Sequence, residues 1–471
     1  MAVSIEQSPL YSTLPIGQQV IFALSNDPIV ANYFKVKFIA KMYVSSVPIN
    51  TSNSAQYVGT FKTTPNNVGV GMFDFRSVLE TFLKPDYEGS TFGLGSTYKT
   101  LSQTHPMHLI DKYAVSENSI RYFAIKFDIE YALTETGDVL SPEDQLQTEE
   151  INTLSYLMFN GVIQYDDILT HFGDDYGYSL IIGGGNFFLN NSTANFLTNS
   201  PTTQYARLTD YGTLPFLNFL PTSSFGLETI VLTYYNEAGG VVGTDSVIQT
   251  VSTGGVAYAG GYAFSRLMYF GAFPANLQGW SSAFNTLVAA GSAPAYYTLY
   301  ATNMFGVASE TYRINIICPN ERGYEGIRLT WLNQWGGWDY YTFNMKSTRS
   351  INTKRVSYTQ LEGTWNESTF KVSGYKGGKK NFKVNSTERI KLNTDFVSED
   401  EGVWFEELIN SNEVYILNGL SADQALTITN KYIEPVVITT SKYIKKTIAN
   451  DKLMQYTFEI EKSKTRRTQA V

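Results

Sequence analysis

The densest group of ionisable residues lies between residues 166 and 175. It contains four aspartates and one histidine: Asp166, Asp167, His171, Asp174 and Asp175. Carboxylates beside an imidazole can bind a hard divalent cation or transfer protons. Their spacing matches no calcium-loop pattern, however, and Asp166 and His171 bracket an apolar pair as the ends of a short capped helix would. We therefore predict no metal site and no catalytic site in this group.

The other two histidines form a second candidate for metal binding. His105 and His108 have a spacing that occurs in zinc sites. No cysteine pair accompanies them, because Cys318 is the only cysteine and lies over two hundred residues away. A loop before a strand at Leu109 is the favoured interpretation. The single cysteine also excludes an internal disulfide.

Sequence motifs of common enzymes are absent. The chain has no Walker phosphate loop, no Gly-x-Ser-x-Gly nucleophile elbow and no His-Glu-x-x-His. Residues 183–185 are three glycines after an apolar run, but aromatic residues follow instead of a helix start, which favours a hairpin turn. We predict that the chain is not an enzyme and needs no cofactor. Two well-separated carboxylates would suffice for a glycosidase, so that alternative stays open.

The most distinctive segment, residues 331–343, holds three tryptophans, two tyrosines and a phenylalanine. If exposed, such rings stack on sugars or nucleobases. The other interpretation is a hairpin with strands at Ile327–Leu332 and from Trp338 onward, a turn at Gly336-Gly337, and buried rings that join sheets. We favour the hairpin. The candidate assembly or ligand-contact residues are Trp331, Trp335, Trp338, Tyr340 and Tyr341.

Length and composition indicate several packed β domains. The chain has 471 residues, of which 43% are hydrophobic, 14% aromatic and 17% charged. Aromatic and β-branched residues suit sheets, and this length allows two to four domains. The net charge of −8 argues against general nucleic-acid binding. No apolar run long enough to span a bilayer occurs, and no signal peptide begins the chain, so we expect no membrane insertion and synthesis in a cytoplasm.

Hydrophobic periodicity predicts the elements that organise the first domain. Residues 33–44 and 122–131 alternate between apolar and polar side chains, which is typical of strands with one solvated face. A turn is expected at residues 25–28. Phe75 to Leu83 repeats at helical spacing, with Asp74 placed to cap the start.

Near the C-terminus, different signals predict a helix, a hairpin and solvated basic strands. Ser398 and Glu401 read as a capping box that opens an amphipathic helix through Ile409. Residues 436–448 and 453–460 read as a hairpin. The lysines between residues 376 and 383 and between 442 and 446 read as guards of a solvated strand edge, with an acidic neighbour or nucleic acid as the alternative partner.

Together these signals predict a mainly β protein of several antiparallel β-sandwich modules with a few short helices. The expected domains are an N-terminal β-sandwich at 1–152, a central aromatic- and Gly-rich β domain at 153–362, and a C-terminal β domain with one amphipathic helix at 363–471. Sheet edges and loops would make homo-oligomeric contacts.

Three segments carry a resemblance to a known group of proteins. They are Trp331-Leu332-Asn333 with Gly336-Gly337-Trp338-Asp339-Tyr340, then Trp404-Phe405-Glu406-Glu407-Leu408-Ile409 leading into a strand, and Gln455-Tyr456-Thr457-Phe458-Glu459-Ile460. These segments resemble structural proteins of tailed bacteriophages, including the crAss-like and related phages of Bacteroidetes. The resemblance covers the last third to half of the chain and carries no catalytic residue.

The resemblance implies a virion protein with immunoglobulin-like β-sandwich modules. It would form an oligomeric ring or cap in the tail, neck or tail tip, would be made in the bacterial host cytoplasm, and would contact copies of itself and other virion structural proteins. No sequence-specific nucleic-acid binding is expected. The alternative is a host-recognition protein that binds or cleaves a surface glycan with the aromatic rings named above and with a Gly-, Ala- and Tyr-rich loop at residues 252–263.

Overall fold

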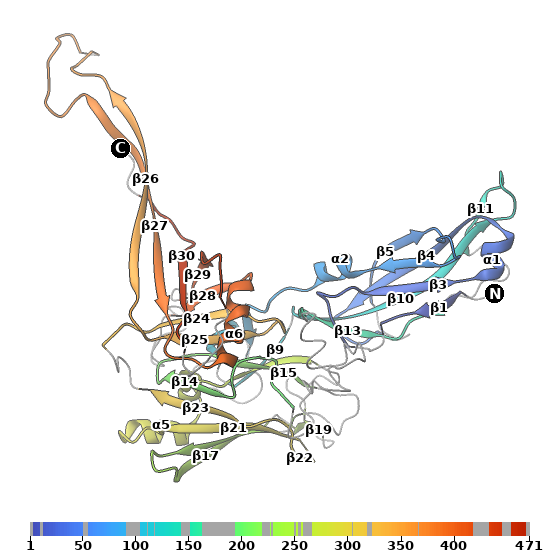
Figure 1. Ribbon diagram of the computed structural model, residues 1–471, viewed down its shortest axis with the longest axis horizontal. Helices are drawn as coiled ribbons and strands as arrows, with labels where there is room; N and C mark the ends of the chain where they lie inside the picture. The colour runs from blue at the N-terminus through green and yellow to red at the C-terminus, as the bar shows by residue number, and fades with distance from the viewer. Residues whose placement is uncertain are drawn as a thin grey trace. The chain divides into compact units, whose positions relative to one another are not determined.

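The computed structural model describes most of the chain and divides it into two compact units. The described residues are 3–9, 13–49, 55–90, 104–110, 112–116, 118–142, 151–162, 194–218, 227, 229–248, 251–252, 256–257, 266–303, 305–317, 323–365, 367–417, 433–444 and 454–467. Unit 1 comprises residues 1–316 and 332–339, and unit 2 comprises 317–331 and 340–471. The chain is mainly β, with antiparallel sheets and few short helices, as the sequence predicts (Figure 1).

Two sheets of unit 1 pack face to face as a sandwich. The larger contains β2 (Thr13–Pro15), β13 (Tyr156–Phe159), β10 (Ile120–Ala132), β4 (Phe34–Ser45) and β5 (Gln56–Thr63), with β11 (Val139–Leu140) and β12 (Ile151–Asn152) also paired to β10. The smaller contains β1 (Ser4–Gln7), β3 (Ile21–Ser25) and β6 (Gly71–Asp74). Phe22 of β3 lies 5.4 Å from Phe127 of β10 between ring centroids, and both rings are buried.

The two predicted alternating runs of this sandwich are neighbours. β4 and β10 pair antiparallel, with Phe38 opposite Ile129 and Val44 opposite Phe123. Their inward side chains form the core, because a period of two places alternate residues on one face. The sheet continues past residue 152 to Phe159, so the expected boundary near 152 is not where the two units divide.

Two short helices of this sandwich differ from the expectation. The predicted turn at residues 25–28 opens a helix, α1 (Asp27–Asn32), because the Asn26 side chain accepts a hydrogen bond from the backbone of Ile29 and Pro28 suits a first helical turn. The predicted helix from Phe75 is shorter than expected: α2 (Arg76–Leu79) is followed by the 3-10 turn η1 (Glu80–Phe82). Asp74 accepts a hydrogen bond from the backbone nitrogen of Arg76 at 3.0 Å.

The rest of unit 1 holds smaller sheets. One contains β14 (Thr203–Arg207), β23 (Tyr312–Ile317), β21 (Tyr296–Asn303), β16 (Thr229–Tyr235) and β17 (Val241–Ile248), with β22 (Gly306–Val307) on β21. Another contains β15 (Thr213–Asn218), β20 (Arg266–Gly271) and β9 (Tyr113–Val115), and two pairs are β7 (Glu88–Ser90) with β8 (Thr104–Pro106) and β18 (Val251–Ser252) with β19 (Val256–Ala257). The helices are η2 (Met107–Leu109), α4 (Pro274–Gln278) and α5 (Ser282–Ala289).

In its described residues, unit 2 is built on an eight-stranded sheet with one helix. The strand order is β25 (Trp338–Phe343), β24 (Ile327–Leu332), β28 (Val414–Leu417), β29 (Ile433–Ile438), β30 (Thr457–Lys462), β27 (Gly378–Asn393) and β26 (Thr348–Gln360), with β31 (Arg466–Arg467) also on β27. Strands from both sides of residue 362 share this sheet, so the unit does not begin at the expected boundary there.

The C-terminal predictions agree with this sheet in pairing but not in strand bounds. β29 and β30 pair antiparallel, with Ile438 opposite Ile460, as the predicted hairpin requires, but β29 ends at Ile438, residues 439–444 form no strand, and β30 begins at Thr457. The predicted turn around residues 450–451 lies outside the described residues. The helix α6 (Glu399–Asn410) buries Trp404, Phe405 and Leu408 against the sheet (Figure 1). No helix in the described part of the chain has the length and apolar character to cross a membrane.

The capping box of α6 gives a direct stability test. The Ser398 side chain accepts a hydrogen bond from the Glu401 backbone, and the Glu401 carboxylate accepts one from the Ser398 backbone. Ser398→Ala removes one of these bonds and should lower the free energy of unfolding of unit 2 by about 1 kcal/mol. Urea unfolding would measure the change, and Ser398→Asp should keep most of the stability because aspartate also caps.

Candidate assembly surface

The aromatic segment forms the predicted hairpin, and its rings are buried. β24 and β25 occupy the predicted positions, and Gly336 has a left-handed φ of +78° in the turn. A Cβ at Gly336 would clash with the carbonyl oxygen of Asn160, so only glycine fits there. The exposed fractions are 0% for Trp331, 2% for Trp335, 0% for Trp338 and 4% for Tyr340, and Tyr341 is half-buried.

These rings belong to two different cores. In unit 2, Trp331 lies 4.9 Å from Trp404 and Tyr341 lies 4.8 Å from Phe405 between ring centroids. In unit 1, the indole nitrogen of Trp338 donates to the carbonyl oxygen of Asp86 at 2.9 Å, and that of Trp335 donates to Asn199 at 3.2 Å. A glycan or a second subunit could reach these rings only after the hairpin opened, so our proposals rest on other aromatic side chains.

The turn of this hairpin is held by a buried amide. Asn333 donates to the carbonyl oxygen of Leu197 at 2.8 Å and to the carboxylate of Asp339 at 3.0 Å. Its side-chain oxygen accepts from the backbone nitrogens of Trp335 and Gly337. Asn333 and its four hydrogen-bond partners lie within unit 1. Each hydrogen-bonding position of the amide is therefore used.

The ionisable groups near this turn are structural. Burial raises the pKa of Tyr312 far above its ordinary value, and the carboxylates of Glu310 and Asp339 add to the rise. His108, one of the candidate metal ligands, is buried with its ring 4.9 Å from that of Trp338. No group of three potential metal ligands occurs among the residues that the structure describes. The Asp and His group at 166–175 and the glycines at 183–185 lie outside those residues.

A two-stranded ribbon of unit 2 carries the exposed aromatic side chains instead. β26 and β27 pair along their whole length, from Thr348 opposite Lys391 to Gln360 opposite Gly378. β27 also pairs with β30 at residues 389–393 and with β31 at 385–386. We call residues 352–384 the arm. Within the arm, β26 and β27 pair with each other and with no other described strand. Figure 1 shows this ribbon extending beyond the other strands of its unit.

The arm exposes a concentration of large apolar side chains. Trp365 and Phe370 are 71% and 53% exposed, and their ring centroids lie 5.1 Å apart. Four more side chains of this kind are exposed nearby: Leu361 (74%), Val372 (77%), Tyr375 (75%) and Phe382 (60%). Single exposed apolar residues are ordinary, but six within 22 residues mark an interaction surface. We call residues 361–377 the arm tip.

The arm is also strongly basic. It contains seven basic residues and two acidic ones, a net charge of +5, so the rest of the chain carries −13. The basic residues are Lys354, Arg355, Lys371, Lys376, Lys379, Lys380 and Lys383. Such a charge distribution suits an acidic partner. Of these residues, only the lysines between 376 and 383 were singled out from the sequence, and Trp365 and Phe370 were not.

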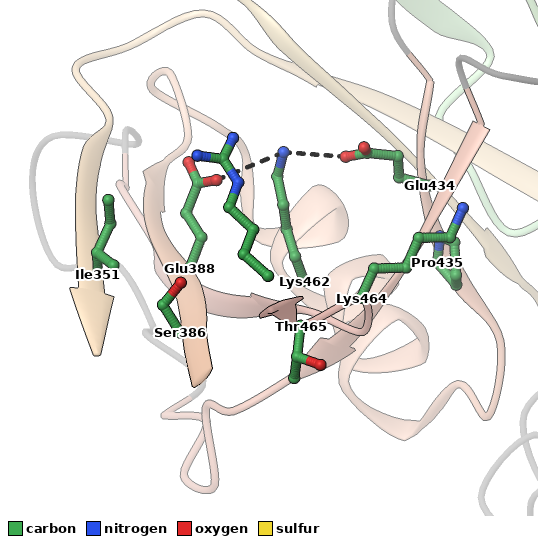
Figure 2. Close-up of a pocket in the computed structure, with 9 residues that line it drawn as sticks. Ile351, Ser386, Glu388, Glu434, Pro435, Lys462, Lys464 and Thr465 are labelled. Atoms are coloured by element: carbon green, nitrogen blue, oxygen red, sulfur yellow. Dashed lines mark ion pairs between the residues drawn. The ribbon is translucent and has the colours of Figure 1, made fainter. Parts of the chain in front are cut away.

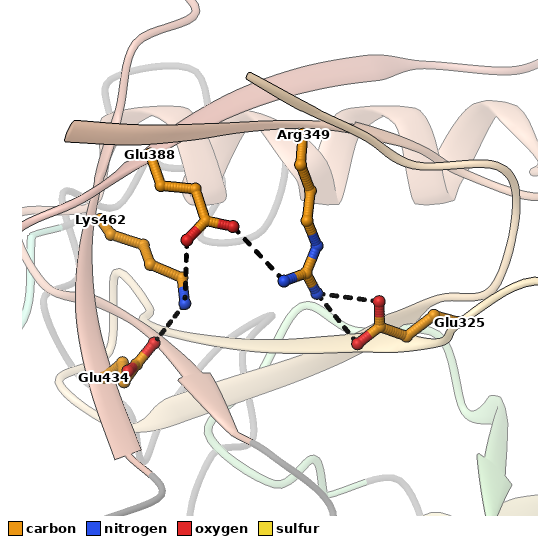
Figure 3. A network of polar contacts seen from close by, with 5 residues as sticks. All are labelled: Glu325, Arg349, Glu388, Glu434 and Lys462. Atoms are coloured by element: carbon orange, nitrogen blue, oxygen red, sulfur yellow. Dashed lines mark hydrogen bonds and ion pairs between the residues drawn. The ribbon is translucent and has the colours of Figure 1, made fainter. Parts of the chain in front are cut away.

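A chain of ion pairs ties the root of the arm to the sheet. Arg349 of β26 donates to both carboxylate oxygens of Glu325, at 2.8 and 2.9 Å, and to Glu388 of β27 at 3.4 Å. Lys462 of β30 lies 3.6 Å from Glu388 and 3.0 Å from Glu434 of β29. Figure 3 shows the five side chains linked in this order. The network crosses four strands, so it restrains the position from which the arm projects.

Part of this network lines a pocket of about 160 Å³. Figure 2 shows Lys462 between its two carboxylate partners, with Ile351, Ser386, Pro435, Lys464 and Thr465 around it. Arg466 completes the lining. Both glutamates are engaged by the same ammonium group, so this pocket is part of the network that holds the root of the arm.

Glu388 pairs with both Arg349 and Lys462, so its replacement is the best test of the network. Glu388→Gln should lower the free energy of unfolding of unit 2 by about 1 kcal/mol at low salt, because two ion pairs are lost in a partly buried setting. The difference should shrink at high salt because exposed charges are screened. Guanidinium would mask the effect, so urea unfolding at two salt concentrations is the measurement. Glu325→Gln is the matched control, with a smaller expected change because its side chain is 65% exposed.

Comparison with known proteins adds no relative to these observations. No protein-family model matches the sequence, and no curated protein matches it.

Proposed function

We propose that this chain is a structural subunit of a tailed-bacteriophage virion, in which it forms an oligomeric ring or cap in the tail, neck or tail tip. The observation that carries the proposal is the arm. Two polar strands with no buried face hold six exposed apolar side chains away from the sheet, a costly arrangement unless a partner covers them. The resemblance of three segments to phage structural proteins supplies the class of particle.

Two further observations support a mechanical role over a catalytic one. The described pocket engages its carboxylates in ion pairs, and the described residues hold no cluster of potential metal ligands. The ion pairs at the root of the arm stiffen the base of a projecting element. Ring subunits fix their neighbours by burying apolar area, and aromatic side chains at the centre of such contacts contribute most of the binding energy.

The glycan alternative relied on exposed rings in the segment 331–343 and in the Tyr-rich loop at residues 252–263. Trp331, Trp335 and Trp338 are buried, and most of the loop lies outside the described residues, so no described ring of these two segments supports the alternative over assembly. The proposal therefore keeps homo-oligomeric contacts and contacts to other virion proteins as the function, with synthesis in the bacterial cytoplasm before assembly.

Electron microscopy of the purified full-length protein tests the proposal. We expect closed particles with rotational symmetry. On intact virions, we expect antibodies against the arm tip to label the tail or neck only where neighbouring subunits leave the arm tip accessible. Antibodies against β5 of unit 1 serve as the second label. A stable protomer that cleaves glycosides, or virions that lack the chain by mass spectrometry, would overturn it.

A further inference from the structure

The partner of the arm is indicated by the charge of the chain itself. We infer that the outer part of the arm, residues 361–383, docks on the acidic outer face of helix α6 in a second copy of this chain, because this part carries five lysines and two glutamates. The inference rests on the proposed function and names the contact through which the subunits join. The arm carries +5 and the rest of the chain −13, so a neighbouring copy presents the complementary charge that an arm needs.

Pairing between two arms is disfavoured by the same charges. β26 is an edge strand of 13 residues, and 10 of its residues in succession are exposed. An edge of this length could add a strand from a second arm. Lys354 and Arg355 lie in the middle of it, so two arms side by side would bring like charges together. An acidic receptor avoids this repulsion.

Helix α6 is the acidic element of the same unit. Seven acidic residues and no basic residue lie between positions 392 and 413: Asp395, Glu399, Asp400, Glu401, Glu406, Glu407 and Glu413. The inner face of the helix is filled by Trp404, Phe405 and Leu408. The outer face exposes Glu399, Asp400 and Val403.

This outer face combines charge with apolar area, as the arm tip does. Val403 is 53% exposed, and Phe396, just before the helix, is 54% exposed. Glu399 and Asp400 are exposed in the first turn, one helical turn from Val403. Trp365 and Phe370 would pack on Val403 and Phe396 while Lys379 and Lys380 approach the carboxylates of Glu399 and Asp400. Both surfaces are exposed in the single chain, so the arm of one chain does not cover its own helix.

A charge-exchange experiment tests this contact. Variant A carries Lys379→Glu and Lys380→Glu in the arm, and variant B carries Glu399→Lys and Asp400→Lys in α6. Each variant alone should sediment mainly as a protomer, because the substituted side chains then have the same sign as the side chains that they face in the contact. An equimolar mixture should form assemblies again, since the new carboxylates in the arm of A meet the new lysines in the helix of B, and the unchanged arm of B meets the unchanged helix of A.

Matched controls separate this contact from a general charge effect. Lys37→Glu with Lys84→Glu, and Glu135→Lys with Asp138→Lys, make the same changes at exposed positions of unit 1 and should assemble like the unaltered chain. The reversed charges in α6 oppose its helix dipole, so thermal unfolding of B is recorded first. If B does not fold, Glu399→Gln with Asp400→Asn replaces it and should weaken assembly at least tenfold.

The outcomes separate this inference from the proposed function. If A disperses but the α6 variants assemble normally, the arm acts on another surface and the α6 contact is wrong, while the assembly function stands. If the unaltered chain is a protomer at about 100 µM, where a contact with a dissociation constant of that order would be visible, self-assembly through the arm is wrong. Arm-dependent binding of that protomer to phosphatidylglycerol vesicles or to DNA would identify the competing partner and would also overturn the inference.

Discussion

Replacing Trp365 and Phe370 with serine should disperse the assembled protein into folded protomers. The two rings are 71% and 53% exposed and touch each other at the arm tip, so their loss removes little from the core of the chain. In an interface, each buried aromatic anchor contributes about 2 kcal/mol or more, so losing both should raise the dissociation constant by about 700-fold or more. Analytical ultracentrifugation over a concentration series measures this shift.

The control for this variant is a pair of aromatic side chains with similar exposure elsewhere. Phe34 is 45% exposed and Tyr205 is 59% exposed, and both lie in unit 1. Replacing them with serine should leave the sedimentation profile unchanged. The free energy of unfolding of the arm-tip variant should stay within about 0.5 kcal/mol of the unaltered value, as is usual for surface substitutions. Unchanged assembly of the arm-tip variant would contradict the role given to the arm.

The largest loss of stability is expected from Asn333→Ala. The amide is 4% exposed and makes four hydrogen bonds within unit 1, which join the turn at residues 333–337 to Leu197 and Asp339. Alanine leaves buried donors and acceptors without partners, so the free energy of unfolding of unit 1 should fall by about 3 kcal/mol. Urea unfolding followed by tryptophan fluorescence measures it, because Trp335 and Trp338 lie in the same unit.

Asn333→Asp gives an independent check of this geometry. The aspartate lacks the amide donor and places a second carboxylate at the distance where Asn333 now bonds Asp339, 3.0 Å. Like charges this close raise the pKa of one of the two carboxyls, so the variant should be less destabilised at pH 4 than at pH 7. Asn410→Ala, at the exposed end of α6, should change stability by less than about 0.5 kcal/mol. Equal losses in the two alanine variants would show that the network at Asn333 contributes little.

Elements with local signals were predictable from the sequence. The capping box at Ser398 and Glu401 and the strands on either side of Gly336-Gly337 lie where the sequence predicts them. In each case residues within a few positions of one another specify the element, so no distant partner is needed to recognise it. Residues 25–28 were predicted as a turn but open the helix α1, because Asn26 and Pro28 are favoured in turns as well as at helix starts.

The arm was not predictable as an interaction surface, although one signal points to it. Sequence patterns show which residues alternate but not which of them a distant strand covers, and the exposure of Trp365 depends on the absence of such a strand. The signal is the pattern of β26, in which Ile351 and Val356 are isolated among polar residues and lie on opposite faces. A 13-residue strand without an apolar face cannot rest on a core, so it must project from one or pair with another chain.

The division of the chain into units was not predictable from the sequence either. Composition changes near residues 152 and 362 guided the expected boundaries, whereas the sheet of unit 2 takes strands from both sides of residue 362. Antiparallel pairing across long separations, such as Trp331 opposite Val414, leaves no mark in the local composition. Only the contacts reveal which strands share a core.

One side of β26 pairs with no other described strand, so we expect the solubility of the protein to depend on ionic strength in an unusual way. At low salt, repulsion between Lys354 and Arg355 of neighbouring chains should keep their long edges from joining into open-ended fibres. Concentrated salt screens that repulsion while it also weakens attraction between basic and acidic surfaces. During storage in molar salt, thioflavin-positive filaments should therefore replace the closed particles that we propose. Dilution should not recover the closed particles.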